Sequence, residues 1–389
     1  MKQRNDNSKQ KPKKKVKWQS AIGTVAMLLA GAACGYFMAD WIVEAAEGAS
    51  AQDAGKNLFS IVILFLEMYI ALFLQLVIHE GGHLVFGLLT GYRYSSFRVG
   101  SLMLIKEEGK IKFKKFSLAG TGGQCLMVPP EMKDGKIPFV LYNLGGSVFN
   151  LLFSALFLFI YFIIPDVQYV SIFFVMAAIM GIAAALMNGI PLQMGTVNND
   201  GYNALSLGKD EEALFSFWIQ MKANEQIARG VRVKDMPEEW FEVPSAKGMK
   251  NSMIAVRGVF ACNRLMDAHE FDKADALMKE ILAMDTAIVD LHKGLLVCDR
   301  MYCALLGSPK EDEMDTLYDA TQKKFMKSMK NYPSVLRTEY VYALLYEKDN
   351  EKAEKIKQRF EKCAKTYPYT SDIESERELI QIAEEHTQQ

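Results

Sequence analysis

Residues 70–90 read IALFLQLVIHEGGHLVFGLLT, an apolar run with three ionisable side chains in its middle. Side chains four positions apart lie on one face of a helix, about one turn from each other. His79 and His83 can therefore offer two imidazoles to one metal ion, with Glu80 beside them to handle a proton. Ionisable groups are costly in hydrocarbon and usually mark a functional site there. The run predicts a membrane helix that carries a metal site.

The pattern H-E-x-x-H on a helix is typical of zinc metalloproteases. A catalytic zinc ion takes three protein ligands and leaves one position for water. The third ligand must come from elsewhere in the chain, and we expect it to be Asp200, an acidic residue in a loop rich in Gly and Asn. Zinc lowers the pKa of bound water to about 7, and Glu80 would pass the proton of that water to the leaving amine.

Composition separates the chain into an apolar part and a charged part. The formal net charge is −1, which gives no indication of a nucleic-acid partner, and 50% of the residues are hydrophobic. Residues 1–17 are strongly basic, residues 18–190 are mostly apolar, and residues 204–389 are charged and mixed. This pattern is typical of a membrane core with a soluble domain. The six scattered cysteines form no C-x-x-C pair, which predicts reduced thiols and no disulfide framework.

Four apolar segments are predicted to cross the membrane. They cover residues 18–46, 58–89, 138–164 and 167–187. Each is compatible with the roughly 20 residues that a crossing needs, and the basic residues 1–17 form a tail that keeps the N-terminus in the cytosol. With this topology His79, the start of the third segment and Asp200 all lie toward the cytosolic face, as a shared metal requires. We expect a multi-pass protein of the cell membrane, in contact with the lipid bilayer, with both termini cytosolic.

A small cytosolic β insertion is predicted at about residues 96–130. SLMLI and IKFKKF read as a β-hairpin around a turn that contains Gly109, and GTGGQCLMVPP reads as another extended segment. Two interpretations stay open. The strands form a surface sheet with no role in recognition, or they present an exposed strand edge that pairs with an unfolded substrate chain.

Asn150 is a polar residue at membrane depth in the third apolar segment. It has two interpretations as well. As a catalytic residue it would hold the substrate backbone or the developing oxyanion. As a structural residue it would make a hydrogen bond between helices.

The charged part of the chain is predicted to be helical, so that the whole protein is mainly α. Residues 204–249 form a helical linker and residues 250–389 a cytosolic domain of antiparallel helix pairs. Residues 264–285 and 342–369 each combine a short acidic turn with a lysine-rich amphipathic helix. They resemble tetratricopeptide-like repeats, with an ordinary helical bundle as the alternative. His269 and His292, in this domain, are expected to be surface or packing residues.

The motifs together resemble the site-2 protease family of intramembrane zinc metalloproteases, over about residues 57–203. The matching elements are His79-Glu80-Gly81-Gly82-His83, Gly145…Asn150 and Asn188-x-x-Pro191…Asn199-Asp200-Gly201. The resemblance implies zinc ligands at His79, His83 and Asp200 and a general base at Glu80. It also implies cleavage of membrane-anchored protein or peptide substrates near the cytosolic face.

The helical domain would then bind the substrate or a protein regulator. The alternative function is a non-catalytic, membrane-tethered scaffold whose helical domain binds protein partners. This alternative is suggested by Ser147, which stands where proline is common in the second element of the family, and by the large helical tail.

Overall fold

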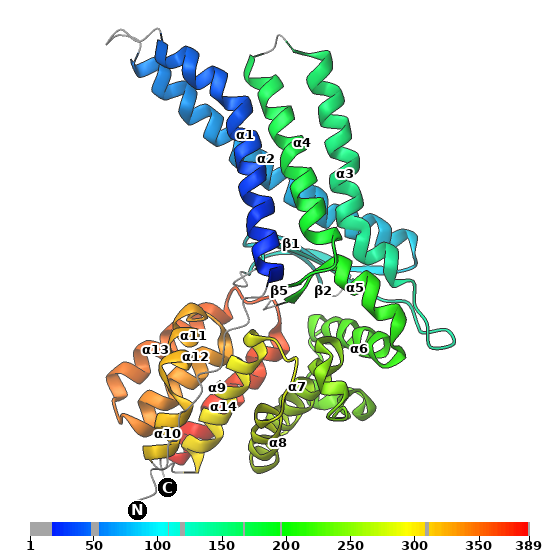
Figure 1. Cartoon of the computed structure of the whole chain (residues 1–389). Helices are drawn as coiled ribbons and strands as arrows, with labels where there is room; N and C mark the ends of the chain where they lie inside the picture. Colours follow the sequence, from blue (N-terminus) through cyan, green and yellow to red (C-terminus); the bar gives the residue numbers. More distant parts are fainter. Residues whose placement is uncertain are drawn as a thin grey trace, which may run out of the picture.

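The computed structural model describes residues 18–47, 54–107, 109–116, 121–165, 168–194, 197–307 and 311–387. These residues are mainly helical, as predicted. Long apolar helices lie at one end, a domain of shorter helices lies at the other, and a small sheet lies between them (Figure 1). The predicted basic tail, residues 1–17, lies outside the described residues.

The apolar end consists of α1 (Trp18–Glu47), α2 (Ala54–Leu89), α3 (Phe139–Ile163) and α4 (Gln168–Gly189). Within the described residues, three stretches are long and apolar enough to cross a membrane: Leu58–Leu89, Phe139–Ile163 and Tyr169–Gly189. They coincide with the second, third and fourth predicted segments. The first predicted segment is a helix, but its apolar part among the described residues is the shorter Met27–Ala39. The helix α1 packs on α4, with Cys34 and Met176 in the shared core.

Two glycines allow α2 and α3 to come close to each other. A Cβ atom built on Gly82 would lie 2.2 Å from the carbonyl oxygen of Gly145, and one built on Gly145 would lie 2.6 Å from the oxygen of Gly82. Small residues permit such close packing of apolar helices. The contact brings the segment that carries His79 and His83 against α3.

The sheet is antiparallel, with the strand order β3-β2-β1-β4. Its strands are β1 (Arg93–Val99), β2 (Leu102–Glu107), β3 (Lys110–Lys115) and β4 (Gly123–Val128). The predicted hairpin is β2–β3, and Gly109 in its turn has φ +78°. The predicted further extended segment is β4, whereas β1 begins before the predicted insertion.

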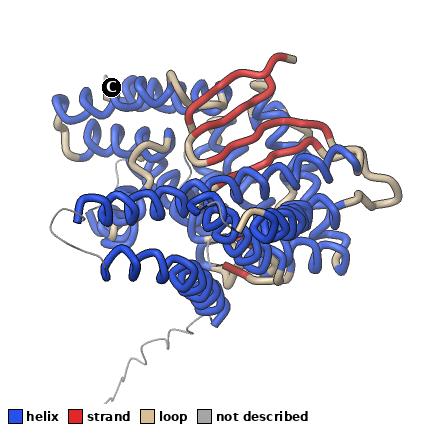
Figure 2. The backbone as a smooth tube through the Cα atoms, turned by 90° about the horizontal axis from the view of Figure 1, so that it is seen from above, coloured by secondary structure: helices blue, strands red, loops and turns tan. Residues whose placement is uncertain are grey.

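Strand β4 is an edge strand of this sheet. It pairs on one side with β1, in a register that places Phe97 opposite Cys125, and no other described strand pairs with it. Figure 2 shows the sheet beside the helices, seen from above. The edge of β4 therefore offers backbone donors and acceptors that are not used by the sheet.

The remaining elements run from the sheet to the second end of the molecule (Figure 1). They are β5 (Gln193–Met194), β6 (Val197–Asn198), α5 (Asp200–Ser206), η1 (Leu207–Lys209), α6 (Glu211–Ala228), η2 (Val233–Asp235), η3 (Glu238–Phe241), η4 (Gly248–Lys250), α7 (Ser252–Asp267), α8 (Phe271–Ala283), α9 (Asp290–Leu306), α10 (Glu311–Leu317), α11 (Ala320–Ser328), α12 (Pro333–Val341), η5 (Tyr342–Tyr346), α13 (Asn350–Ala364) and α14 (Thr370–His386). Helix α6 packs on both β4 and α7, so it joins the sheet to the helical domain.

The two similar segments of the helical domain have the same local fold. Each is a helix, a tight turn and a second helix: α7 to α8 in one case, and η5 to α13 in the other. His269 and Lys348 occupy the left-handed region, with φ of 60° and 56°, each two residues before the next helix begins. The predicted helix pairs are therefore present, and their assignment to tetratricopeptide-like repeats stays a prediction.

Candidate metal centre

Three predicted ligands converge at the junction of the apolar helices and the rest of the chain. His79 and His83 lie one turn apart on α2, and Asp200 begins α5. The two Nε2 atoms are 3.2 Å apart. Oδ2 of Asp200 lies 3.2 Å from Nε2 of His79 and 3.3 Å from Nε2 of His83. The described part of the chain has this one group of three metal-ligating side chains.

These separations suit a tetrahedral ion. For zinc bonds of about 2.0–2.1 Å, the ligand atoms of a regular tetrahedron are about 3.3–3.4 Å apart. The observed distances of 3.2, 3.2 and 3.3 Å come close to that spacing on all three edges. The triangle leaves a fourth position for a water molecule or a substrate, as in catalytic zinc sites.

The outer nitrogen of each imidazole is already engaged. Nδ1 of His79 donates to Oδ1 of Asn150 at 2.7 Å, and Nδ1 of His83 donates to the carbonyl oxygen of Tyr142 at 2.8 Å. Both partners are acceptors, so each ring carries its proton on Nδ1 and turns the lone pair of Nε2 toward Asp200. When both imidazoles are neutral, two lone pairs and a carboxylate meet here, and either a metal cation between them or a proton on one Nε2 removes their repulsion. The donor set therefore fits a zinc ion.

Asn150 makes hydrogen bonds from α3 to α2, as its structural interpretation expects, and its contact with substrate stays a prediction. Its amide nitrogen donates to the carbonyl oxygen of Gln75 at 2.9 Å and to Oε1 of Gln75 at 2.7 Å, and its side chain has no exposed surface. With its oxygen on His79, both ends of the amide are used. Asn150 therefore acts as a positioning residue for His79. We did not predict Gln75, although a glutamine one turn before His79 in an apolar run was a usable signal.

Asp200 is held in place by its neighbour Asn199. The Oδ1 atom of Asn199 accepts from two backbone N–H groups, and its Nδ2 atom donates to the carbonyl oxygens of Met187 and Ile190 at 2.7 and 2.6 Å. Asn199 is also the N-cap of α5. A Cβ atom on Gly201 would lie 2.1 Å from a backbone oxygen at the end of α4. The sequence Asn-Asp-Gly thus fixes the loop that brings the carboxylate to α2.

The general base predicted at Glu80 lies against the start of β4. Glu80 is 6% exposed, and a Cβ atom on Gly123 would lie 2.3 Å from its Oε1 atom. Only a glycine lets the strand pass this close to the carboxylate. The first residue of β4 therefore lies against the predicted catalytic group, which covers a face of the sheet at this point.

Arg98 fastens this end of β4 to β1, which the sequence did not lead us to expect. Its guanidinium is buried and donates to the carbonyl oxygen of Gly100 at 2.8 Å, to Oγ1 of Thr121 at 2.6 Å and to the carbonyl oxygen of Gly123 at 3.3 Å. An arginine with several fixed donors holds a backbone more firmly than a single point charge would.

Comparisons of the chain with protein-family models, with curated proteins and with solved structures find no match.

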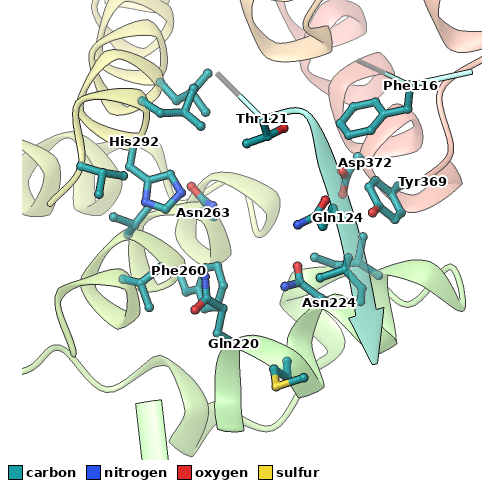
Figure 3. A pocket seen from close by; sticks show the side chains of 18 of the residues that line it. Phe116, Thr121, Gln124, Gln220, Asn224, Phe260, Asn263, His292, Tyr369 and Asp372 are labelled. Carbon is teal, nitrogen blue, oxygen red and sulfur yellow. The ribbon is translucent and has the colours of Figure 1, made fainter. Parts of the chain in front are cut away.

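A cavity of about 950 Å³ leads from the metal centre toward the helical domain. It is lined by residues of β4, α6, α7, α9 and α14 (Figure 3). His292, expected to be a surface or packing residue, lines this cavity, and burial lowers its pKa to about 4. We call this cavity the chamber.

Proposed function

We propose that this protein is an intramembrane zinc endopeptidase of the site-2 protease kind, which cleaves membrane-anchored protein or peptide substrates near the cytosolic face. One observation carries the proposal. Two histidines and an aspartate from separate parts of the chain meet at distances suited to tetrahedral zinc, with Glu80 beside them and a chamber open to them. The site lies where three helices that are long and apolar enough to span a bilayer meet the rest of the chain.

The chemistry divides among these residues in a simple way. His79, His83 and Asp200 would hold zinc through Nε2, Nε2 and Oδ2, with Asn150 and the carbonyl of Tyr142 orienting the two rings. A zinc ion held there would polarise the scissile carbonyl and lower the pKa of a bound water. Glu80 accepts a proton from the attacking water and delivers it to the leaving amine as the C–N bond breaks.

The substrate would bind along the edge of β4. A helical substrate has its backbone groups in intrachain hydrogen bonds, so it must become extended before its scissile bond is accessible. The edge of β4 that pairs with no other described strand would supply backbone donors and acceptors for such an extended chain. The carbonyl oxygens of Gly123 and Cys125 are excepted, because they accept from Arg98 and from the Tyr142 hydroxyl. Of the two interpretations of the β insertion, the proximity of Glu80 to Gly123 favours the one in which the strand edge binds substrate.

Metal analysis of the purified full chain tests the site. We expect one zinc ion per chain in the wild type and in Glu80→Gln, and loss of zinc in His79→Ala and in Asp200→Ala. His269→Ala is the matched control, because this histidine lies in the helical domain beside Glu378 and should leave zinc content unchanged. A wild type without zinc, or Asp200→Ala with full zinc content, would refute the metal centre.

Cleavage in cells tests the activity. New termini of single-pass proteins should appear with the wild type and be absent with Glu80→Gln, since that variant keeps the metal but lacks the base. Turnover by Glu80→Gln at the wild-type rate would refute the mechanism.

A non-catalytic scaffold is the second candidate function. It is supported by the size of the helical domain, which has an extensive core of its own between Met249 and Ala383. If Glu80→Gln fully rescues a deletion phenotype and a chain without residues 250–389 does not, the scaffold is the better description.

A further inference from the structure

One acid in the chamber wall lacks a cationic partner. The helices α7, α9 and α14 contribute four acids to this wall: Asp267, Asp299, Asp372 and Glu376. Asp267 pairs with Arg232, and both Asp299 and Glu376 pair with Arg337. Among the described residues, Asp372 has no Lys, Arg or His within ion-pair distance, and its hydrogen-bond partner is the hydroxyl of Tyr367 at 3.3 Å. Asp372 is partly buried, so the chamber has an acid here that no described cation compensates when it is ionised.

Aromatic rings surround this acid. Phe116 lies at the end of β3, and its ring centroid is 5.5 Å from that of Tyr367 and 6.1 Å from that of Tyr369. The rings of Tyr367 and Tyr369 are 5.8 Å apart and steeply inclined to each other. Figure 3 shows Phe116, Tyr369 and Asp372 together on one side of β4. Aromatic faces attract cations, and the ring of Phe116 already has the guanidinium of Arg98 5.9 Å from its centroid. We call Phe116, Tyr367, Tyr369 and Asp372 the acid–aromatic pocket.

Four amide side chains line the chamber near β4. Gln124 belongs to β4, Gln220 and Asn224 to α6, and Asn263 to α7 (Figure 3). No described residue forms a hydrogen bond with any of these four side chains. A primary amide both donates and accepts, so it can pair with the N–H and C=O groups of an extended peptide.

Building on the proposed function, we propose that the chamber binds the cytosolic flank of the substrate as an extended chain, with a lysine or arginine side chain of that flank in the acid–aromatic pocket. Lysine and arginine are concentrated just cytosolic of membrane-crossing segments. A substrate whose scissile bond lies at Glu80 therefore brings basic residues into the chamber. Strand β4 links the two places, because Gly123 contacts Glu80 and Gln124 is the next residue along it.

The size and charge of the chamber suit this occupant. Its volume of about 950 Å³ is near the top of the range of ligand cavities, roughly 300–1,000 Å³, so it takes a short extended segment and excludes a folded domain. Burial, and then the nearby carboxylate of Glu376, raise the pKa of Asp372 to about 7. A bound cation relieves both effects, because it compensates the buried negative charge.

Peptide binding to the full-length Glu80→Gln chain in detergent tests the inference without cleavage. The probes are fluorescent 12-residue peptides of Ser, Thr and Val with one central variable residue: Lys, Met or Glu. We expect fluorescence anisotropy to show that the Lys peptide binds about tenfold more tightly than the Met peptide, as an ion pair with cation–π contacts predicts. Adding Asp372→Asn should abolish this preference, and adding Phe116→Leu should reduce it.

Glu374→Gln is the matched control, since Glu374 lies on the same helix but is exposed, and it should keep the preference. Equal binding of the Lys and Met peptides, or no measurable binding of the Lys peptide, would overturn the inference. So would a preference that survives Asp372→Asn. If the wild type cleaves substrates with zinc but the Lys peptide binds no more tightly than the Met peptide, this inference alone is refuted. If the Lys peptide is preferred but the wild type holds no zinc and cleaves nothing, the proposed function alone is refuted.

Discussion

Oδ1 of Asn150 lies 2.7 Å from Nδ1 of His79, so an amide on α3 fixes the orientation of this ring on α2, which we propose as a metal ligand. The amide is itself held by Gln75, one turn before that ring on α2. The orientation of His79 thus depends on the packing of two helices that are far apart in the sequence. Mutation of a residue that hydrogen-bonds to a metal ligand commonly lowers metal affinity or activity about 10- to 100-fold.

We predict that Asn150→Ala weakens zinc binding about 10- to 100-fold without removing the site, because His79 loses its orienting acceptor. Competition with a chromophoric chelator measures the affinity. Asn350→Ala, an exposed amide on α13, serves as the control and should bind zinc normally. Unchanged zinc affinity combined with lost cleavage would instead assign Asn150 the role of contacting substrate.

Adjacent glycines of the H-E-x-x-H segment should respond differently to alanine. A Cβ atom on Gly82 meets the backbone of α3, so Gly82→Ala should separate the helices, cost about 1–3 kcal/mol or more and lower zinc content. A Cβ atom on Gly81 meets nothing within 4 Å, so Gly81→Ala should be neutral or stabilise the helix by up to about 1 kcal/mol. Thermal unfolding in detergent, with zinc analysis, measures both. Equal effects of the two substitutions would contradict the packing described here.

Arg98→Ala should slow cleavage by about 100-fold at unchanged zinc content, since it releases the start of β4 from β1 and displaces the strand edge from Glu80. Arg98→Lys should recover part of the rate, because lysine keeps the charge but lacks the planar set of donors. Arg93→Ala is the control on the same strand, where the side chain is 68% exposed. A normal rate for Arg98→Ala would mean that β4 needs no such anchor.

The raised pKa of Asp372 predicts a pH-dependent stability. In the unfolded chain an aspartate titrates near 3.9, whereas burial and Glu376 raise the pKa of Asp372 to about 7. Between about pH 4 and pH 7 the folded state therefore binds more protons at this group than the unfolded state does. For this reason the free energy of unfolding decreases as the pH rises through this range, and Asp372 causes no further change above it. Two further charges affect the pKa of Asp372: Asp267 raises it and Arg232 lowers it. The hydrogen bond from the Tyr367 hydroxyl also lowers this pKa.

Asp372→Asn should remove this dependence. The unfolding temperature of the variant, relative to the wild type, should rise from pH 4 to pH 7 and then level off. Fluorescence-detected unfolding of the full chain in detergent between pH 4 and 9 measures the difference, with Glu374→Gln as the control. A difference that does not change with pH would show that Asp372 titrates normally.

Several patterns within single segments were read correctly from the sequence. The three long apolar helices follow from composition, and the β2–β3 hairpin follows from β-prone runs around Gly109. The pairing of His79 with His83 follows from the spacing of a helix, because residues four apart share a face wherever that helix lies. The strand β1 was missed because RYSSFRV has little apolar alternation, and it is stabilised by its two neighbours in the sheet.

The sequence by itself determined the apolar helices, the pair of imidazoles and the helical character of the last third of the chain, because each depends on neighbours within one element. Only the tertiary structure decided that Asp200 reaches those imidazoles and that β4 passes over Glu80. It also decided that the side chain of Asn150 forms hydrogen bonds with His79 and Gln75. These relationships depend on the contact of Gly82 with Gly145 and on the loop held by Asn199. Distances between segments far apart in the chain are fixed by packing, which no local pattern contains.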